Sequence, residues 1–400
     1  MRLLKDGWLP AYLEWTDDHE SPTAFHQWIG LSALAIALER RIWLRHPYFT
    51  IYPNLYVVLI AGSALCRKSS SIRLGTEIIA ALEKPPLEIG QKMSPERMLA
   101  KLWKHEFDLP EENKTIRKSQ GYIAADELAT LFGRDAYKNG FMANITALYD
   151  CPSAFTYTTR KDQDMVLKDV CLNILGASTL EWLKLCIPPD IVGGGFLGRF
   201  ILVQGNNPKQ KDFFEVIDET HIRKQKELWK ELLHDLNHIR ENLSGPYEVT
   251  KQGKKWFNEW RADFEANIPV GLLPEYVGRR HTTLLKVAML LAASSYDEPI
   301  ITQDVLQGAH DTLLVTEGFM PELIAVIGQS DAGADIQRVL EVIRKHYEIS
   351  RTDLARKVSH HLNKDQLDLA IKTLHDGGQV YTKMVGTKMV YGVREDMEEI

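Results

Sequence analysis

The chain of 400 residues has 44% hydrophobic content, enough to bury a large core and to form two or three domains. Its formal net charge of −6 excludes a protein that coats nucleic acid with a generally basic surface, although a few positive side chains could still gather in a channel. No apolar run approaches the ~18 residues of a membrane span, and the N-terminus lacks the pattern of a cleavable leader, so we expect a soluble cytoplasmic protein with no membrane partner.

Residues 1–50 are expected to form a helical N-terminal element. Phe25, Trp28, Leu31, Leu34 and Leu38 recur at helical spacing, and a polar stretch follows through His46-Pro47. This pattern predicts amphipathic helices that serve as a packing or collar element.

Residues 54–72 have the pattern of a phosphate-binding loop. An apolar strand is followed by Gly62, a tight loop ending in Lys68-Ser69, and the start of a helix. Lys68 would reach the β and γ phosphates of ATP, and the Ser69 hydroxyl would bind Mg²⁺. Arg67 stands where such loops usually have glycine. The residues expected to bind the nucleotide are Gly62, Ser63, Arg67, Lys68, Ser69 and Ser70.

A second apolar strand, at 121–126, ends in two adjacent carboxylates. Asp126 could hold Mg²⁺ through water, and Glu127 could activate the water that attacks the γ-phosphate. Taken alone, such a pair is usually the start of an ordinary helix. Zinc is not expected, because the 4 cysteines and 13 histidines lack metal-ligand spacing.

Strand and helix patterns alternate through residues 51–205, the expected ATPase core. This alternation predicts a parallel sheet covered by helices on both faces. The expected strands are 55–61, 87–91, 121–126, 170–177 and 200–204, and the expected helices are 70–83, 94–106 and 180–187.

Between the acidic pair and the next strand, residues 155–167 are typical of a hairpin. Its charged tip would offer Arg160 and Lys161 to a DNA backbone, or would simply be solvated. The strand that follows ends at Ser178-Thr179, and either hydroxyl could sense the γ-phosphate or hold the lytic water.

Arg199 follows a triple glycine and precedes the last strand of the core. It could extend into a neighbouring subunit and stabilise transition-state charge there as an arginine finger. The alternative is a structural salt bridge.

Residues 206–327 carry mainly helical patterns and would form a helical lid. Residues 328–333 have the composition of a linker. In residues 334–400, three helices, at 336–346, 352–358 and 364–375, precede a hairpin that turns at Gly386-Thr387, which predicts a winged helix. Such a domain could bind duplex DNA, or it could pack on protein and regulate the ATPase.

These motifs together resemble the AAA+ ATPase core of hexameric helicases, in particular the minichromosome maintenance and superfamily 3 branch. The similarity is carried by Gly62–Ser69, Asp126-Glu127, the hairpin before Ser178 and the step Gly198-Arg199-Phe200. Residues 279–293 are similar to that branch's lid helices, which carry a second sensor arginine, so the resemblance assigns this role to Arg279 or Arg280.

A closer resemblance is to helicase-like P-loop ATPases of phages, prophages and plasmids, and it covers about residues 10–325. Larger members of that group carry a primase module, for which this chain has no room, so any primase or other replication protein would be a separate partner.

The sequence therefore predicts an ATP- and Mg²⁺-dependent DNA translocase or helicase. It would act on single-stranded or forked DNA as a homo-oligomer, most simply a hexamer, during replication of a phage or mobile element in a bacterial or phage-infected cell. Two alternatives stay open, namely a DNA-associated signalling or defence switch and an origin-binding initiator or helicase loader that does not unwind DNA.

Overall fold

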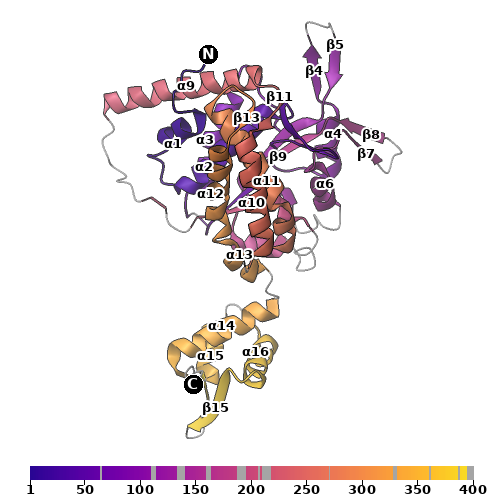
Figure 1. The fold of residues 1–400 in the computed structure, drawn as a ribbon. Coiled ribbons are helices and arrows are strands. Elements are labelled where there is room, and N and C mark those ends of the chain that lie inside the picture. The colour runs from indigo at the N-terminus through magenta and orange to yellow at the C-terminus, as the bar shows by residue number, and fades with distance from the viewer. Residues whose placement is uncertain are drawn as a thin grey trace. The chain divides into compact units, whose positions relative to one another are not determined.

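The computed structural model divides the chain into two compact units, Met1–Ile324 and Ala325–Ile400, which we treat separately (Figure 1). The structure describes residues 1–63, 65–109, 114–132, 140–158, 164–186, 195–205, 208–209, 218–269, 271–327, 331–359, 362–385 and 388–393.

The first unit is built on a four-stranded parallel sheet in the order β10-β3-β9-β6. Its strands are β3 (Tyr56–Ile60), β6 (Gln120–Ala125), β9 (Cys171–Ser178) and β10 (Phe200–Gln204). Nearly every residue of these strands is buried, as expected for continuous apolar runs in a parallel sheet. The predicted α/β class and parallel sheet are confirmed. The strand expected at 87–91 is reduced to a single parallel bridge between Glu88 and Tyr122.

Helices cover both faces of this sheet. On one face, the Asn173 side chain of β9 donates a hydrogen bond to the carbonyl of Ala35 in α2 (Thr23–Leu38), at 3.4 Å. On the other face, Gly176 lies so close to Leu128 of α5 (Leu128–Phe132) that an added Cβ would come within 2.5 Å of Leu128 Cγ. Because side chains alternate along a strand, residues 173 and 176 must point to opposite faces.

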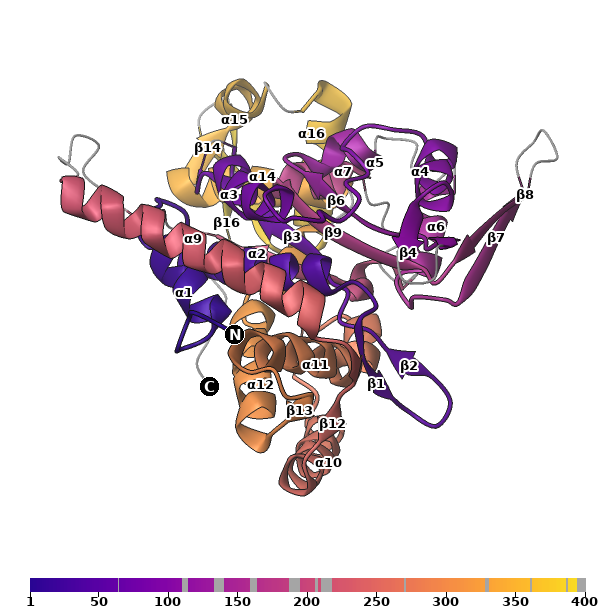
Figure 2. The same cartoon turned by 90° about the horizontal axis from the view of Figure 1, so that it is seen from above.

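The helix α2 lies between the sheet and the helix α11 (Pro274–Ser295) (Figure 2). Residues Trp28 to Leu38 are all buried. The expected amphipathic pattern is therefore wrong for α2, because it has neighbours on all sides. The preceding α1 (Trp8–Trp15) and the residues of α11 share one hydrophobic core with it.

The polar stretch after α2 forms a short hairpin of β1 (Ile42–Arg45) and β2 (Thr50–Ile51). Strand β1 also pairs with β11 (Gly245–Pro246), so the N-terminal element is tied to the helical region some 200 residues later. Residues 1–50, 51–205 and most of 206–327 thus belong to a single compact unit.

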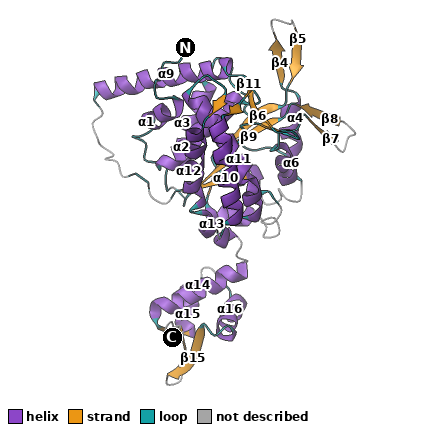
Figure 3. Cartoon of the chain, viewed as in Figure 1, coloured by secondary structure: helices purple, strands orange, loops and turns teal. Residues whose placement is uncertain are grey.

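The remaining elements of this unit are mostly helices, seen in Figure 3, and none in the described part of the chain is long and apolar enough to span a membrane. The helices are α3 (Lys68–Ala80), α4 (Pro95–Trp103), α6 (Phe141–Leu148), α7 (Leu180–Cys186), α9 (Glu219–Asn242), α10 (Lys251–Ala266), α12 (Gln303–Glu317) and α13 (Met320–Ile327). The additional strands are β4 (Glu106–Leu109), β5 (Lys114–Arg117), β7 (Ala154–Thr158), β8 (Asp164–Lys168), β12 (Glu248–Val249) and β13 (Ile300–Ile301).

The second unit combines three helices with a three-stranded antiparallel sheet in the order β14-β16-β15. Its elements are α14 (Asp331–His346), β14 (Glu348–Ser350), α15 (Arg351–Val358), α16 (Lys364–Asp376), β15 (Val380–Val385) and β16 (Lys388–Val393). Leu354, Leu374 and Val380 lie in a hydrophobic core of its own. Ser350 caps α15 by accepting a hydrogen bond from the Asp353 N–H.

Two boundaries of the second unit differ from the expected ones. Residues 331–333, expected in a linker, already belong to α14, while 328–330 lie outside the described residues. The strands β15 and β16 form the predicted hairpin, whose expected turn residues Gly386 and Thr387 also lie outside the described residues.

Candidate functional site

The loop after β3 opens onto a cavity of about 600 Å³ at the carboxyl edge of the sheet. Lys68 and Ser69, in the first turn of α3, line this cavity together with Asp126, which follows β6. The three side chains meet because all parallel strands end at the same edge. Arg67 and Ser70 also line it, and so do Glu88 and Gln91, which no motif in the sequence had singled out.

The Lys68 side chain folds back on its own loop. Its Nζ donates hydrogen bonds to the carbonyl oxygens of Ala61 and Gly62, at 2.7 and 2.8 Å. Burial lowers the pKa of this amine, an effect that the nearby carboxylate of Glu127 opposes. An added Cβ at Gly62 would lie 2.8 Å from Cδ1 of Leu65, whose exposed side chain is free to move away, and the neighbouring Ser63 is also exposed.

Arg67 adopts the left-handed conformation that glycine adopts most easily, with φ at 47°, and Cys66 before it has φ at 61°. Neighbours from the N-terminal segment hold this backbone in place. The Ser21 hydroxyl donates to the Cys66 carbonyl at 2.6 Å, and Arg67 Nε pairs with Glu20 Oε2 at 2.5 Å. Tertiary contacts thus stabilise a conformation that costs an L-residue about 1–2 kcal/mol. No motif in the sequence predicts that Glu20 and Ser21 hold the backbone of Cys66 and Arg67.

The second acidic residue, Glu127, meets the end of β9. Ser178 donates its hydroxyl to Glu127 Oε1 at 3.2 Å, because the pairing of β6 with β9 sets Ala125 opposite Gly176, and Glu127 and Ser178 each follow two residues later. The neighbouring Thr179 has another role, since its hydroxyl accepts a hydrogen bond from the Trp182 N–H in the first turn of α7. Of the two candidate sensor hydroxyls, the structure brings that of Ser178 to the acidic pair.

The predicted hairpin at 155–167 is present as the antiparallel pair β7 and β8, which projects from the sheet (Figure 1, Figure 2). The two basic residues expected at its tip, Arg160 and Lys161, lie outside the described residues.

Arg199 ends the short 3₁₀ helix η2 (Leu197–Arg199), immediately before β10. It therefore lies at the amino edge of the sheet, and the five residues of β10 separate it by about 15 Å from the carboxyl edge, where the loop before Lys68 lies. Its guanidinium donates to the carbonyl of Gly195 at 2.5 Å and pairs with Asp150 Oδ2 at 3.5 Å.

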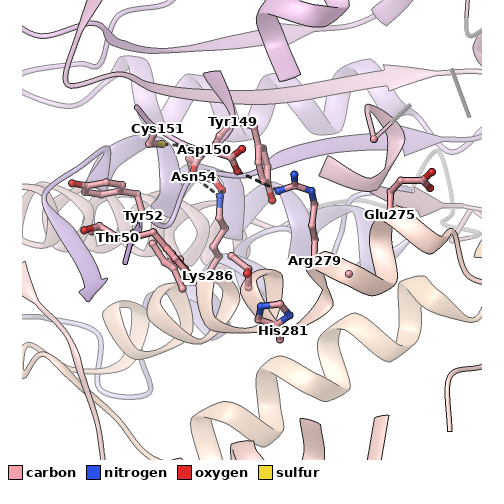
Figure 4. Close-up of a pocket in the computed structure, with 15 residues that line it drawn as sticks. Thr50, Tyr52, Asn54, Tyr149, Asp150, Cys151, Glu275, Arg279, His281 and Lys286 are labelled. Carbon is pink, nitrogen blue, oxygen red and sulfur yellow. Dashed lines mark hydrogen bonds and ion pairs between the residues drawn. The ribbon is translucent and has the colours of Figure 1, made fainter. Parts of the chain in front are cut away.

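Arg279 reaches the same carboxylate, with NH1 3.2 Å from Asp150 Oδ1. Figure 4 shows Arg279 pointing toward Asp150 across a second cavity, of about 570 Å³, which Tyr149 and Lys286 also line. In the described part of the chain, neither Arg199 nor Arg279 lines the cavity beside Lys68.

Arg280 has a different environment. Its side chain is 0% exposed, its Nε pairs with Glu317, and its guanidinium lies over the ring of Trp260 at 5.2 Å from the centroid. The buried Tyr276 hydroxyl donates to the same carboxylate at 2.7 Å. Of the two candidate sensor arginines, Arg279 is partly exposed and Arg280 belongs to a buried ion pair between α11 and α12.

The described residues contain no cluster of three or more His, Cys, Asp or Glu side chains that could hold a metal ion by themselves. A Mg²⁺ ion at Ser69 and Asp126 would therefore depend on phosphate oxygens for its remaining ligands, as Mg²⁺ bound with a nucleotide commonly does. No protein-family model matches the chain, and no curated protein matches it.

Proposed function

We propose that this protein is an ATP-driven DNA translocase or helicase that acts as a ring-shaped homo-oligomer in phage or mobile-element DNA replication. The observation that carries the ATPase part is the convergence of Lys68, Ser69 and Asp126 on one cavity, with Glu127 and Ser178 in contact beside it. A lysine, a hydroxyl and two carboxylates at the carboxyl edge of a parallel sheet are the groups that phosphoryl transfer to water requires.

Each group has a distinct role in the proposed reaction. Lys68 exchanges its contacts with the Ala61 and Gly62 carbonyls for phosphate oxygens. Ser69 and Asp126 hold Mg²⁺, which supplies charge neutralisation on the phosphates. Glu127 orients and deprotonates the attacking water, and Ser178 aligns the Glu127 carboxylate.

The position of Arg199 supports an oligomer. At the amino edge of the sheet it is remote from the phosphate loop of its own subunit, so any contact with a nucleotide must be with one bound elsewhere. A ring in which each amino edge faces the next subunit's nucleotide meets this condition, and a hexamer is the form that the family resemblance implies.

The winged-helix interpretation of the second unit rests on its three helices and antiparallel hairpin. Its third helix, α16, does not carry the basic surface of a DNA reader. Exposed Asp365, Asp368 and Asp376 outnumber exposed Lys364 and Lys372 there. We therefore propose that this unit contacts protein, and that DNA contact resides in the β7–β8 hairpin with Arg160 and Lys161.

The proposal is tested by ATP hydrolysis with and without single-stranded DNA, at low and physiological salt, with Lys68→Ala as the control. Turnover that DNA stimulates and that Lys68→Ala abolishes supports a translocase, and strand displacement on a forked duplex then separates a helicase from an initiator or loader. Turnover indifferent to DNA would favour the signalling or defence switch, and no turnover would refute the ATPase assignment.

A further inference from the structure

Three cationic side chains gather around one tyrosine and one carboxylate at the amino edge of the sheet. The guanidinium carbons of Arg199 and Arg279 each lie 5.9 Å from the centroid of the Tyr149 ring, and Lys286 Nζ lies 3.9 Å from it. Asp150 is the carboxylate that pairs with both arginines.

The three cations are held differently. Lys286 is buried, and its Nζ donates to the backbone carbonyl of Asn54 at 3.2 Å and to Asn54 Oδ1 at 2.7 Å, an arrangement visible in Figure 4. The ammonium group of Lys286 is therefore already hydrogen-bonded within its own subunit. The two guanidiniums are held less completely. Arg199 Nε is buried and has no hydrogen-bond partner in the described part of the chain, and the Arg279 side chain is 31% exposed.

Two guanidiniums this close repel one another. The pKa of Arg199 is lowered, first by burial and then by the charge of Arg279, and the carboxylate of Asp150 opposes both effects. Without Asp150, the two arginines would lose the group that draws them together. The Asp150 side chain is itself 58% exposed, so it stands at the open side of the cavity.

The cluster also has more positive than negative charge, with three cations and two carboxylates, Asp150 and Glu275, lining or bordering a cavity of about 570 Å³. Paired guanidiniums with spare donors suit the several oxygens of a phosphoryl group, since each can offer two parallel N–H groups. An anion that carries more charge than a carboxylate can compete with Asp150 for them.

We propose that Asp150 is a positioning residue that holds Arg199 and Arg279 as a pair, and that the pair receives the γ-phosphoryl group of the nucleotide bound in the neighbouring subunit. The inference rests on the proposed ring ATPase. It makes Arg279 a partner of Arg199 at the subunit interface, and the Asp150 carboxylate occupies both guanidiniums until the phosphoryl group takes its place.

Mixed oligomers test this proposal. Lys68→Ala subunits lack a working phosphate loop but keep the arginine edge, whereas Arg199→Ala subunits have the reverse defect. If the arginine acts between subunits, a mixture of the two hydrolyses ATP well above the sum of the separate proteins. When Lys68→Ala/Asp150→Asn subunits replace Lys68→Ala subunits in this mixture, kcat should fall at least 10-fold and KM for ATP should stay within about twofold. Lys68→Ala/Asp150→Glu subunits should restore most of the lost kcat.

The matched control is Lys68→Ala/Asp169→Asn. Asp169 is 51% exposed and pairs with a different arginine, Arg40, at 3.7 Å, so it should complement like Lys68→Ala alone. Binding of ATP by the Asp150→Asn single variant with unchanged Kd establishes that it is folded.

Equal complementation by the Asp150→Asn and Asp169→Asn proteins would overturn the role of Asp150 while leaving the ring mechanism intact. A change in DNA affinity with unchanged kcat would assign the pair to a DNA phosphate and would also overturn it. If Lys68→Ala and Arg199→Ala subunits do not complement each other, Arg199 does not act between subunits, and this proposal is refuted.

Discussion

Removing the charge of Glu317 should destabilise the first unit strongly, because Arg280 would then be buried without a counter-charge. Arg280 is 0% exposed and Glu317 is 6% exposed, so water cannot solvate the arginine that remains. Breaking a buried pair by changing one partner costs ~3–5 kcal/mol. The Trp260 ring stays in contact with Arg280 in the variant and partly stabilises its charge. For Glu317→Gln we therefore expect the free energy of unfolding to fall by about 3 kcal/mol, the lower end of this range.

The second variant, Arg280→Met/Glu317→Gln, removes both charges. The oxygen of the new amide still accepts the hydrogen bond of the Tyr276 hydroxyl, so this buried donor keeps its partner. At least ~2 kcal/mol of the lost stability should return, because the uncompensated charge was the cause of the loss. The double variant should also hydrolyse ATP at the wild-type rate, which would leave Arg279 as the functional one of the two candidate sensor arginines, Arg279 and Arg280.

Urea unfolding followed by tryptophan fluorescence measures these free energies. All 9 tryptophans lie within Met1–Ile324, so the signal reports this unit alone. Glu322→Gln, an exposed change on the adjacent α13, is the matched control and should stay within ~0.5 kcal/mol of wild type. A loss below ~1 kcal/mol for Glu317→Gln, or no recovery in the double variant, would refute the reasoning. A folded double variant without ATPase activity would return Arg280 to the candidate sensors.

Three further predictions concern the candidate site and its supports. Glu127→Gln should bind ATP as wild type does and lose at least ~100-fold in kcat. Ser178→Ala removes only the group that aligns Glu127, so it should lose ~10-fold in kcat. Equal losses for the two variants in single-turnover assays would contradict the assigned roles. Arg160→Ala/Lys161→Ala should weaken the binding of single-stranded DNA and leave ATP turnover without DNA unchanged. The slope of log affinity against log salt concentration should become smaller by about 1–2. An unaltered slope, measured by fluorescence anisotropy, would exclude contact of these residues with DNA phosphates. Burial lowers the pKa of His26 to about 3, so His26 stays neutral in the folded state while the unfolded chain gains a proton as pH falls through about 6.5. This group should therefore cost ~1.4 kcal/mol of stability between pH 7.5 and 5.5, and urea titrations of His26→Gln should lack that share of the pH dependence.

Much of this fold could be predicted because its signals are local. The run 55–61 is apolar at every position and the run 170–177 at all but Asn173, and such short segments are typical of strands buried on both faces inside a parallel sheet. Ser350 predicts the start of α15, because a helix cap depends only on the side chain of the capping residue and on the next three residues. The loop before Lys68 and the pair Asp126-Glu127 could be placed together because strand ends in a parallel sheet share an edge.

Other features were decided by the tertiary structure alone. The periodicity of α2 suggested an amphipathic helix, but strands on one side and α11 on another bury nearly all of it. Neighbouring residues of the same type, Ser178 with Thr179 and Arg279 with Arg280, could not be separated, since their different roles depend on which partner each one meets.

Asp150 had no signal in the sequence. Its partners Arg199 and Arg279 lie 49 and 129 positions further along the chain, and only folding brings the three together. The sequence by itself determined the four central strands, the cap at Ser350 and the turn that leads to Lys68, since these depend on residues within a few positions of one another. The tertiary structure decided which side chains meet at each edge of the sheet, because that depends on the packing of segments that are distant in the chain.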